Sequence, residues 1–322
     1  MLLATERILM TRIITRSESR IARRAVDQGA RSAALPLAMA QRSKNLLQRQ
    51  ELQLLKPKKE ILISTFNVQT LNHPHKAPEL VHSAIQNNID VICIQEHRFH
   101  HPDLELKHTD VGKGWTVISA SAWKNSQNAT IGGVGILLSP KALKSLQNIE
   151  KITPRIVVAT FNGNPATTVI SCYSPTNISE ESDVLLFYEK LSALTRHVPK
   201  HNLLIVAGDM NAQMDGKFSY HNSKNRNGNH LADYLEENNL LCLNTHYQKR
   251  PSKLWTHTYP NRSHGQLDYI FINKKWKNSA LNCEAYKTFD SVGSDHKIVS
   301  AKIRLSLRAN KIKSSKSPQN LY

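Results

Sequence analysis

The chain has 322 residues, of which 40% are hydrophobic, and it carries a formal net charge of +18. This length fits one large α/β domain with tails or two small domains. The excess of Lys and Arg indicates an anionic partner, and nucleic acid is the commonest partner of this kind. No apolar stretch reaches the roughly 18 residues that a membrane-spanning helix needs, so no membrane partner is expected, and nothing implies an obligate protein partner.

Cysteine usage indicates a reduced, intracellular protein. The cysteines all lie inside apolar runs and show no CxxC spacing (Cys93, Cys172, Cys242 and Cys283). This placement is typical of core residues and argues against zinc ligands or a disulfide framework.

Residues 1–59 differ from the rest in composition, because they are rich in arginine and contain no aromatic residue. They are consistent with a basic arm for nucleic-acid binding or nuclear targeting, a leader that folds little, or a mitochondrial transit segment. The acidic residues Glu6, Glu18 and Asp27 argue against a transit segment, which is therefore the least favoured of the three interpretations. A nuclear location is expected before a mitochondrial one. The tail, 306–322, is also basic and is expected to be disordered.

The segment 60–305 has the alternation of strands and helices that is typical of an α/β domain. Helices are expected at 76–86, at 180–197 with Ser179 as its cap, and at 231–237. Strands are expected at 61–66, 91–94, 115–122, 134–138, 155–161, 167–173, 203–206, 240–244, 267–272, 284–289 and 297–305.

The stretch 202–211, read as NLLIVAGDMN, organises the rest of the domain. Its apolar run predicts a strand buried on both faces, after which Gly208 allows a tight turn. Asp209 and Asn211 then project from the tip of the strand, where ligands bind in open α/β sheets. Taken alone, they also fit an Asx turn that closes a core strand.

Polar residues follow several other predicted strands in the same way. Asn67, Glu96 and Tyr173 lie at the ends of their strands, whereas Asp268 lies near the start of 267–272 and the pair Asp295-His296 precedes the last strand. Each one could be a cap or a turn, but so many coincidences are improbable, and convergent tips would build one site. Carboxylates without thiolates favour Mg²⁺ or Mn²⁺, and a His oriented by a carboxylate can activate water.

These residues, with their neighbours, resemble the endonuclease/exonuclease/phosphatase superfamily over roughly 60–305. The motifs are Asn67, Gln95-Glu96, Tyr173-Ser174-Pro175, Gly208-Asp209-Met210-Asn211, Leu267-Asp268-Tyr269 and Ser294-Asp295-His296. Within it, the chain looks most like the apurinic-type endonuclease domain of non-LTR retrotransposons, of the RTE or craniofacial-development-protein kind. The closer likeness rests on Gly132-Gly133-Val134-Gly135-Ile136, Gln266-Leu267-Asp268-Tyr269-Ile270 and Lys275-Trp276-Lys277-Asn278-Ser279.

The resemblance implies a four-layer α/β sandwich, in which two packed β-sheets are flanked by helices. It implies that Glu96 is the principal ligand of a Mg²⁺ or Mn²⁺ ion, with Asp295 nearby, and that Asn67 arranges metal and phosphate. Gln69 departs from the family, because repair apurinic endonucleases usually carry an acid there. The number of metal ions therefore stays open.

The same resemblance implies the roles of the other polar residues. Tyr173 and Asn211 would contact the scissile phosphate, and Asp209 would act on the attacking water or on the leaving group. His296, oriented by Asp268, would be the other candidate base or a stabiliser of phosphate charge. The products would carry a 3′-hydroxyl and a 5′-phosphate.

Two further groups of residues leave alternatives open. His97, His100 and His101 could ligate zinc, but no partner pair with zinc-site spacing follows them, so we expect a polar, partly basic rim beside Glu96. The residues Trp255, Lys275, Trp276 and Lys277 could grip DNA, although core packing explains Trp276 equally well.

The sequence thus predicts a Mg²⁺-dependent endonuclease that nicks one strand of duplex DNA, as retrotransposons nick their target sites. One alternative is a phosphodiesterase or phosphatase of the same fold that acts on RNA, lipid or inositol phosphates. The other is a catalytically idle domain that binds protein or nucleic acid. No inositol-phosphatase signature and no reverse-transcriptase sequence is present, so the domain is free, truncated or derived from a mobile element.

Overall fold

The computed structural model describes residues 53–286, 289 and 292–306. Two units are distinguished, Met1–Glu51 and Leu52–Tyr322. The predicted basic segment up to residue 52 and the tail from 307 lie outside the described residues. Leu54 and Leu55 are only 1% exposed, so the packed domain begins before the predicted boundary at Glu60.

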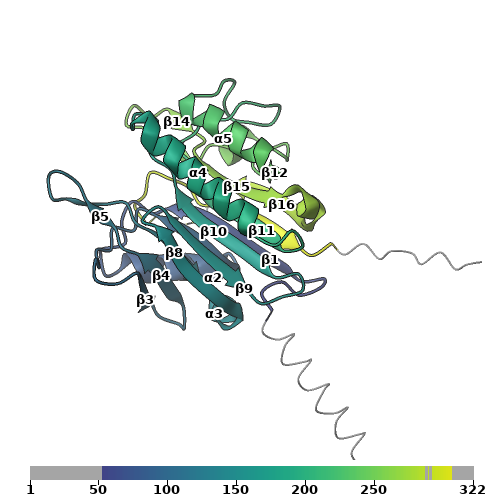
Figure 1. Cartoon of the computed structure of the whole chain (residues 1–322). Helices are drawn as coiled ribbons and strands as arrows, with labels where there is room; N and C mark the ends of the chain where they lie inside the picture. Colours follow the sequence, from purple (N-terminus) through teal and green to yellow (C-terminus); the bar gives the residue numbers. More distant parts are fainter. Residues whose placement is uncertain (1–52, 287–288, 290–291, 307–322) are drawn as a thin grey trace, which may run out of the picture. The chain divides into compact units, whose positions relative to one another are not determined.

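The domain is built on two large β-sheets (Figure 1). One is seven-stranded, in the order β16 (Ala280–Ala285), β17 (Val299–Arg304), β1 (Glu60–Asn67), β2 (Ile89–Gln95), β7 (Val134–Leu138), β4 (Thr116–Ala120) and β3 (Leu106–Asp110). The other is six-stranded, in the order β12 (Leu240–Cys242), β15 (Asp268–Asn273), β11 (Leu203–Asp209), β10 (Thr167–Tyr173), β9 (Ile156–Phe161) and β8 (Leu146–Thr153). Two small hairpins pair β5 (Trp123–Lys124) with β6 (Thr130–Ile131) and β13 (His257–Thr258) with β14 (His264–Gly265).

Apolar side chains fill three layers, one between the sheets and one on each outer face. Strands of both sheets supply the inner layer, to which Ile63 and Ile205 belong. Helices α4 (Glu181–His197) and α5 (Arg226–Glu237) cover the six-stranded sheet, whereas α2 (Lys76–Gln86) covers the other (Figure 1). The short helix α3 (Pro140–Ser145) follows β7. The predicted four-layer α/β sandwich is confirmed.

Strand register brings the predicted tips to one end of the sandwich. In the parallel pair of β1 and β2, Asn67 lies opposite Gln95, directly before Glu96. In the parallel pair of β10 and β11, Tyr173 lies opposite Asp209. Asp209 is also opposite Asp268, because β15 runs antiparallel to β11 and begins where β11 ends.

Two predicted strands are corrected by the sheet ladders. The strand expected at 284–289 is β16, which begins earlier and ends at Ala285, because its ladder with β17 runs from Ala280 opposite Ile303 to Ala285 opposite Val299. The strand expected at 240–244 ends at Cys242. There the side chain of Asn244 replaces the ladder, since it accepts from Ile270 N–H and donates to Asp268 O.

Two predicted helix starts are also corrected. Ser179 does not cap α4, because its hydroxyl is bonded to the hydroxyl of Thr176 and the cap residue is Glu180, which makes no side-chain bond there. Helix α5 begins at Arg226, well before residue 231. The side chain of Asn225 accepts from Gly228 N–H and so satisfies an end group of the helix.

The sequence also missed the edge strands β3 and β8 and the short α3. Both strands are largely polar and partly exposed, so they lack the apolar run that indicates a buried strand. As predicted, the four cysteines are buried and form no disulfide (Cys93, Cys172, Cys242 and Cys283). Among the described residues, no helix combines the length and apolarity needed to cross a membrane.

Candidate active site

Polar side chains from both sheets form one cluster at the strand tips, called here the polar cluster: Asn67, Gln69, Glu96, Tyr173, Asp209, Asp268, Asp295 and His296. Asn67 links the two sheets within it. Its Nδ2 lies 2.9 Å from Glu96 Oε1 and 3.0 Å from Asp209 Oδ2. Ionised carboxylates only accept hydrogen bonds, so the amide must face them with its NH₂ group. Its side-chain oxygen accepts from the backbone N–H of Gln69. Asn67 therefore positions the two carboxylates through its NH₂ group, and its oxygen points away from them.

Glu96 stands on the more open side of the cluster, with its side chain 19% exposed. Its Oε1 also accepts from the hydroxyl of Tyr173 at 2.9 Å, and its Oε2 lies 3.3 Å from Arg98 Nη2. Burial and then the charge of Glu96 raise the pKa of Tyr173, which therefore remains a neutral O–H donor.

Asp209 lies between the two sides of the cluster and is 2% exposed. Besides Asn67, it accepts from the backbone N–H of Asn211 at 2.9 Å. Burial, followed by the nearby charge of Asp268, raises the pKa of Asp209 far above its ordinary value. A carboxyl shifted in this direction can exchange a proton near neutral pH.

The predicted contact between Asp268 and His296 is present. His296 Nδ1 lies 2.9 Å from Asp268 Oδ2, and both side chains are buried. Burial lowers the pKa of His296, but the charge of Asp268 and its hydrogen bond outweigh burial and raise it to about 9. The imidazole is therefore held as a cation at neutral pH, with Nδ1–H on the carboxylate.

Asp295 is joined to the cluster through Gln69. Gln69 Nε2 donates to Asp295 Oδ2 at 2.9 Å, and the hydroxyl of Ser294 donates to Asn67 O. The sequence presented Gln69 only as a departure from the family. In the structure its neutral amide positions Asp295, where an acid would repel it.

Three residues of the site hold the left-handed backbone conformation that disfavours residues with a Cβ. They are Gln69 (φ 56°), Glu96 (φ 55°) and Asn211 (φ 46°). The Asn211 amide donates to Ser174 O at 3.0 Å, which holds this turn in place. Such backbone conformations persist when hydrogen bonds over-determine them, and they cluster at functional sites.

The donor set fits a hard divalent cation. Glu96 and Asp209 both accept from Asn67, Asp295 accepts from Gln69, and carboxylates without thiolates match the preference of Mg²⁺ or Mn²⁺. Within the described part of the chain, Asp268 Oδ1 and Asp295 Oδ1 are buried without a hydrogen-bond partner. Unpaired carboxylate oxygens are costly to bury, and a cation would satisfy them.

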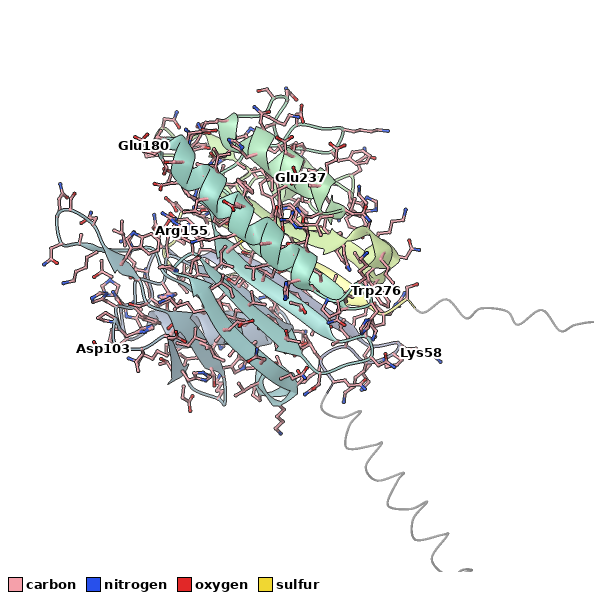
Figure 2. The ribbon with its side chains drawn as sticks, in the orientation of Figure 1. Lys58, Asp103, Arg155, Glu180, Glu237 and Trp276 are labelled. Carbon is pink, nitrogen blue, oxygen red and sulfur yellow. The ribbon has the colours of Figure 1, made fainter. Side chains whose placement is uncertain are left out.

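The residues expected to bind DNA either lie away from the polar cluster or already make contacts within the protein. Lys275, Trp276 and Lys277 form the 3-10 helix η2 (Lys274–Ser279), which follows the opposite end of β15 from Asp268. The Trp276 indole donates to Asn202 O and packs against the inner core, as the packing alternative expects. Figure 2 shows it far from Arg155, which donates to Tyr173 O beside the site. Trp255 stacks on His264 at 3.8 Å, with Lys297 Nζ 2.8 Å from the centre of its ring.

The three clustered histidines do not form the polar rim that was expected. His97 is fully buried, and burial lowers its pKa to about 4, so it is neutral. His101 is also buried and bonds to Ser119, whereas His100 bonds to Ala122 O. The rings thus bond to separate partners and form no zinc site together.

Sequence reasoning missed Arg155 and His257. The guanidinium of Arg155 lies 4.6 Å from the ring centre of Trp123 and 5.2 Å from that of Tyr173, and it donates to Tyr173 O. A lone Arg before an apolar strand carries no signal of these contacts. His257 Nε2 lies 3.5 Å from Asp295 Oδ2, and its position shortly before the Gln266–Ile270 motif was the only hint.

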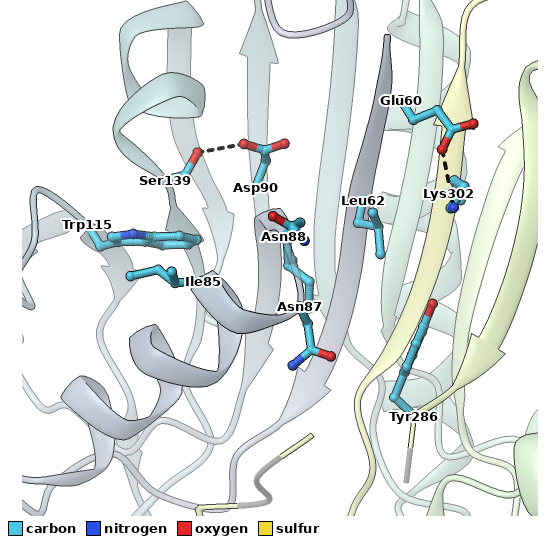
Figure 3. A pocket seen from close by; sticks show the side chains of 11 residues that line it. Glu60, Leu62, Ile85, Asn87, Asn88, Asp90, Trp115, Ser139, Tyr286 and Lys302 are labelled. Carbon is cyan, nitrogen blue, oxygen red and sulfur yellow. Dashed lines mark hydrogen bonds and ion pairs between the residues drawn. The ribbon is translucent and has the colours of Figure 1, made fainter. Parts of the chain in front are cut away.

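A hollow of about 590 Å³ lies away from this cluster (Figure 3). Its wall includes Glu60 and Asp90 at the beginnings of β1 and β2, whereas Asn67 and Glu96 lie at the other ends of these strands. The candidate site is therefore separate from the hollow in Figure 3.

Comparisons with known proteins agree with this arrangement. Residues 64–296 match the Endonuclease/Exonuclease/phosphatase family. The chain is 30% identical over 261 residues to craniofacial development protein 2 of Bos taurus, across 78% of this chain and 42% of that protein. It is similarly 30% identical to craniofacial development protein 2 of Tragulus javanicus, across 78% of this chain and 43% of that protein, so it spans about two fifths of the length of these relatives.

Solved structures show the same fold at lower identity. AP endonuclease LMAP from Leishmania major is 14% identical with a TM-score of 0.62, over 78% of this chain and 90% of that one. The endonuclease domain of TRAS1, a telomere-specific non-LTR retrotransposon, is 18% identical with a TM-score of 0.55, over 77% and 100%. The 3′ phosphatase NExo from Neisseria, bound to a product DNA hairpin, is 15% identical with a TM-score of 0.56, over 76% and 99%. With the match over most of the domain and the convergent strand tips, the chain belongs to the endonuclease/exonuclease/phosphatase family.

Proposed function

We propose that this chain is a divalent-metal-dependent DNA endonuclease that nicks one strand and leaves a 3′-hydroxyl and a 5′-phosphate. The observation that carries the proposal is the hydrogen-bonded series Glu96–Asn67–Asp209, which lies across both sheets beside the Asp268–His296 pair. The net charge of +18 supports a polyanionic substrate. The structural neighbours whose titles name DNA or apurinic-site enzymes support the same class.

Glu96 and Asp295 are the residues that would hold the metal ion, with Asn67 and Gln69 orienting them. When bound, a Mg²⁺ or Mn²⁺ ion neutralises phosphate charge and stabilises the departing oxygen. The neutral amides keep the two carboxylates in place without adding charge of their own.

Asp209 and His296 divide the proton chemistry according to their environments. Asp209 takes a proton from the attacking water, because its raised pKa makes it a stronger base than an ordinary Asp. The water oxygen bonds to phosphorus, the bond from phosphorus to the 3′ oxygen breaks, and that oxygen takes up a proton from solvent, to which Asp209 then releases the proton that it accepted. His296 keeps its own proton and presents Nε2–H to a phosphate oxygen, where negative charge grows.

A plasmid assay tests the proposal. The full chain is incubated with supercoiled plasmid and Mg²⁺, with excess EDTA as the matched control, and the ends of the nick are identified by ligation and end labelling. We expect nicks that a DNA ligase seals directly, since it needs a 3′-hydroxyl beside a 5′-phosphate. Nicking that persists in EDTA, or phosphate release from inositol phosphates or 3′-phosphorylated DNA without any nicking, would overturn it.

A further inference from the structure

A second group of ligand atoms lies beside the candidate site and includes a residue that the proposed mechanism does not use. His257, Asp295 and His296 each offer one ligand atom, and these atoms all lie within 4.8 Å of one another. His257 Nε2 is 3.5 Å from Asp295 Oδ2, and His296 Nε2 is 3.8 Å from Asp295 Oδ1. Both distances exceed those of good hydrogen bonds, but they approach the edge of about 3.3 Å between ligands of a tetrahedral Zn²⁺ ion.

The backbone holds the three residues side by side. His257, in β13, forms an isolated β-bridge with His296, and Thr258 N–H donates to Asp295 O at 3.0 Å. The two imidazole rings lie 4.5 Å apart, centre to centre. The rings of His257 and Tyr259 form a T-shaped pair, also with their centres 4.5 Å apart. The ligand atoms are therefore brought together by main-chain pairing before any ion is present.

Apart from the proton on His296 Nε2, which a metal ion displaces when it binds, the remaining bonds of these side chains leave the ligand atoms available. His296 donates Nδ1–H to Asp268, which directs Nε2 toward Asp295. A histidine that binds a metal usually gives its other N–H to a carboxylate in this way. Asp295 Oδ1 is buried and has no hydrogen-bond partner among the described residues, so a bound ion would satisfy it. The Asp295 side chain as a whole is 37% exposed, which leaves the site open to solvent.

We propose that His257, Asp295 and His296 form a binding site for a transition-metal ion of the Zn²⁺ class, with an open fourth position. Two imidazoles and one carboxylate suit Zn²⁺ or Co²⁺, whereas Mg²⁺ takes oxygen ligands. An ion bound here occupies His296 Nε2 and Asp295 together. The second part of the inference rests on the proposed function: Zn²⁺ at this site inhibits nicking, because it removes the group that stabilises phosphate charge.

Metal binding is tested without reference to nuclease activity. The full chain is stripped of metal and titrated with Co²⁺, whose visible absorption reports tetrahedral coordination, and then with Zn²⁺ to displace it. We expect one tetrahedral Co²⁺ per chain. In His257→Phe, which keeps an aromatic ring but lacks the nitrogen, affinity should fall by more than about 100-fold; in Asp268→Asn it should fall by about 10- to 100-fold. His264→Phe, in the same hairpin and stacked on Trp255, is the control and should bind as the wild type does.

Equal Co²⁺ affinity and equal spectra in the wild type and His257→Phe would overturn the site. The inhibitory part is read from the ratio of nicking rates with and without Zn²⁺ in excess Mg²⁺, which should rise toward one in His257→Phe. A wild type that binds Zn²⁺ and nicks undiminished would overturn the inhibition alone. A wild type that never nicks contradicts the proposed function, and the Co²⁺ titration still decides whether the site exists.

Discussion

The two sides of the polar cluster differ in their access to water. On one side, the Glu96 side chain is 19% exposed and shares its oxygens among Asn67, Tyr173 and Arg98. On the other, the side chains of Asp268 and His296 are 0% and 7% exposed and bond to each other. A partly exposed carboxylate can exchange water for a hydrated cation, whereas a buried ion pair holds a proton at a defined atom. In the proposed mechanism, this difference lets one site combine metal binding with proton chemistry.

Removing the open carboxylate should have the largest effect. Glu96→Gln keeps the shape of the side chain but loses the charge that holds the ion, so we expect nicking with Mg²⁺ to fall by about 10³-fold. The melting temperature should change little, because Glu96 is partly exposed. Glu60→Gln, at the far end of β1, is the control and should nick normally. A Glu96→Gln enzyme with normal rates would show that the open side does not hold the ion.

Removing the buried pair should have the next largest effect. His296→Ala should lower kcat by about 10²- to 10³-fold with a modest change in DNA affinity, since it removes charge stabilisation that the transition state needs. Asp268→Asn should do the same more mildly. The double variant should be little worse than His296→Ala alone, because the two side chains act as one unit. Additive losses, accompanied by lower melting temperatures, would assign both residues to structure alone.

The pH dependence separates the two sides further. The rate should rise with pH as Asp209 becomes ionised, in a range above that of an ordinary Asp, and fall again near pH 9 as His296 loses its proton. His296 also contributes to stability with a defined sign, because its folded pKa is raised. That contribution is fully present below the unfolded value near 6.5 and is lost as pH rises through about 9.

Thermal unfolding of metal-free protein checks this sign. His296→Ala should lower the melting temperature more at pH 6 than at pH 10. An equal loss at both pH values would mean that His296 stabilises the fold by packing and not through its charge.

The smallest expected effect concerns the hydrogen bond from Gln69 to Asp295. Gln69→Ala removes the amide that donates to Asp295, so we expect about a tenfold weaker affinity for Mg²⁺ and a similar loss of activity at low Mg²⁺. Saturating Mg²⁺ should restore most of the rate. A loss that Mg²⁺ does not restore would give Gln69 a part in the chemical step.

Several parts of this site could be predicted because they follow from local sequence. An apolar run followed by Asp, Glu or Asn indicates a strand and its tip, and on this basis Asp209 and Glu96 were placed correctly at strand ends. The contact of Asp268 with His296 was also expected. The polar edge strands β3 and β8 could not be found in this way, because their pairing depends on a neighbouring strand and not on burial of their own side chains.

The sequence by itself determined the family, the alternation of strands and helices, and the polar residues at the strand tips, since each depends on patterns a few residues long. Tertiary structure decided the bonds between these residues. Asn67 reaches Asp209 across 142 positions of sequence, and His257 reaches Asp295 only because β13 pairs beside the segment that precedes β17. It also placed Trp276 in packing at the other end of β15, away from the cluster. Hydrogen bonds and ion pairs act over a few ångströms, so their partners are fixed by how the two sheets pack, which no local pattern specifies.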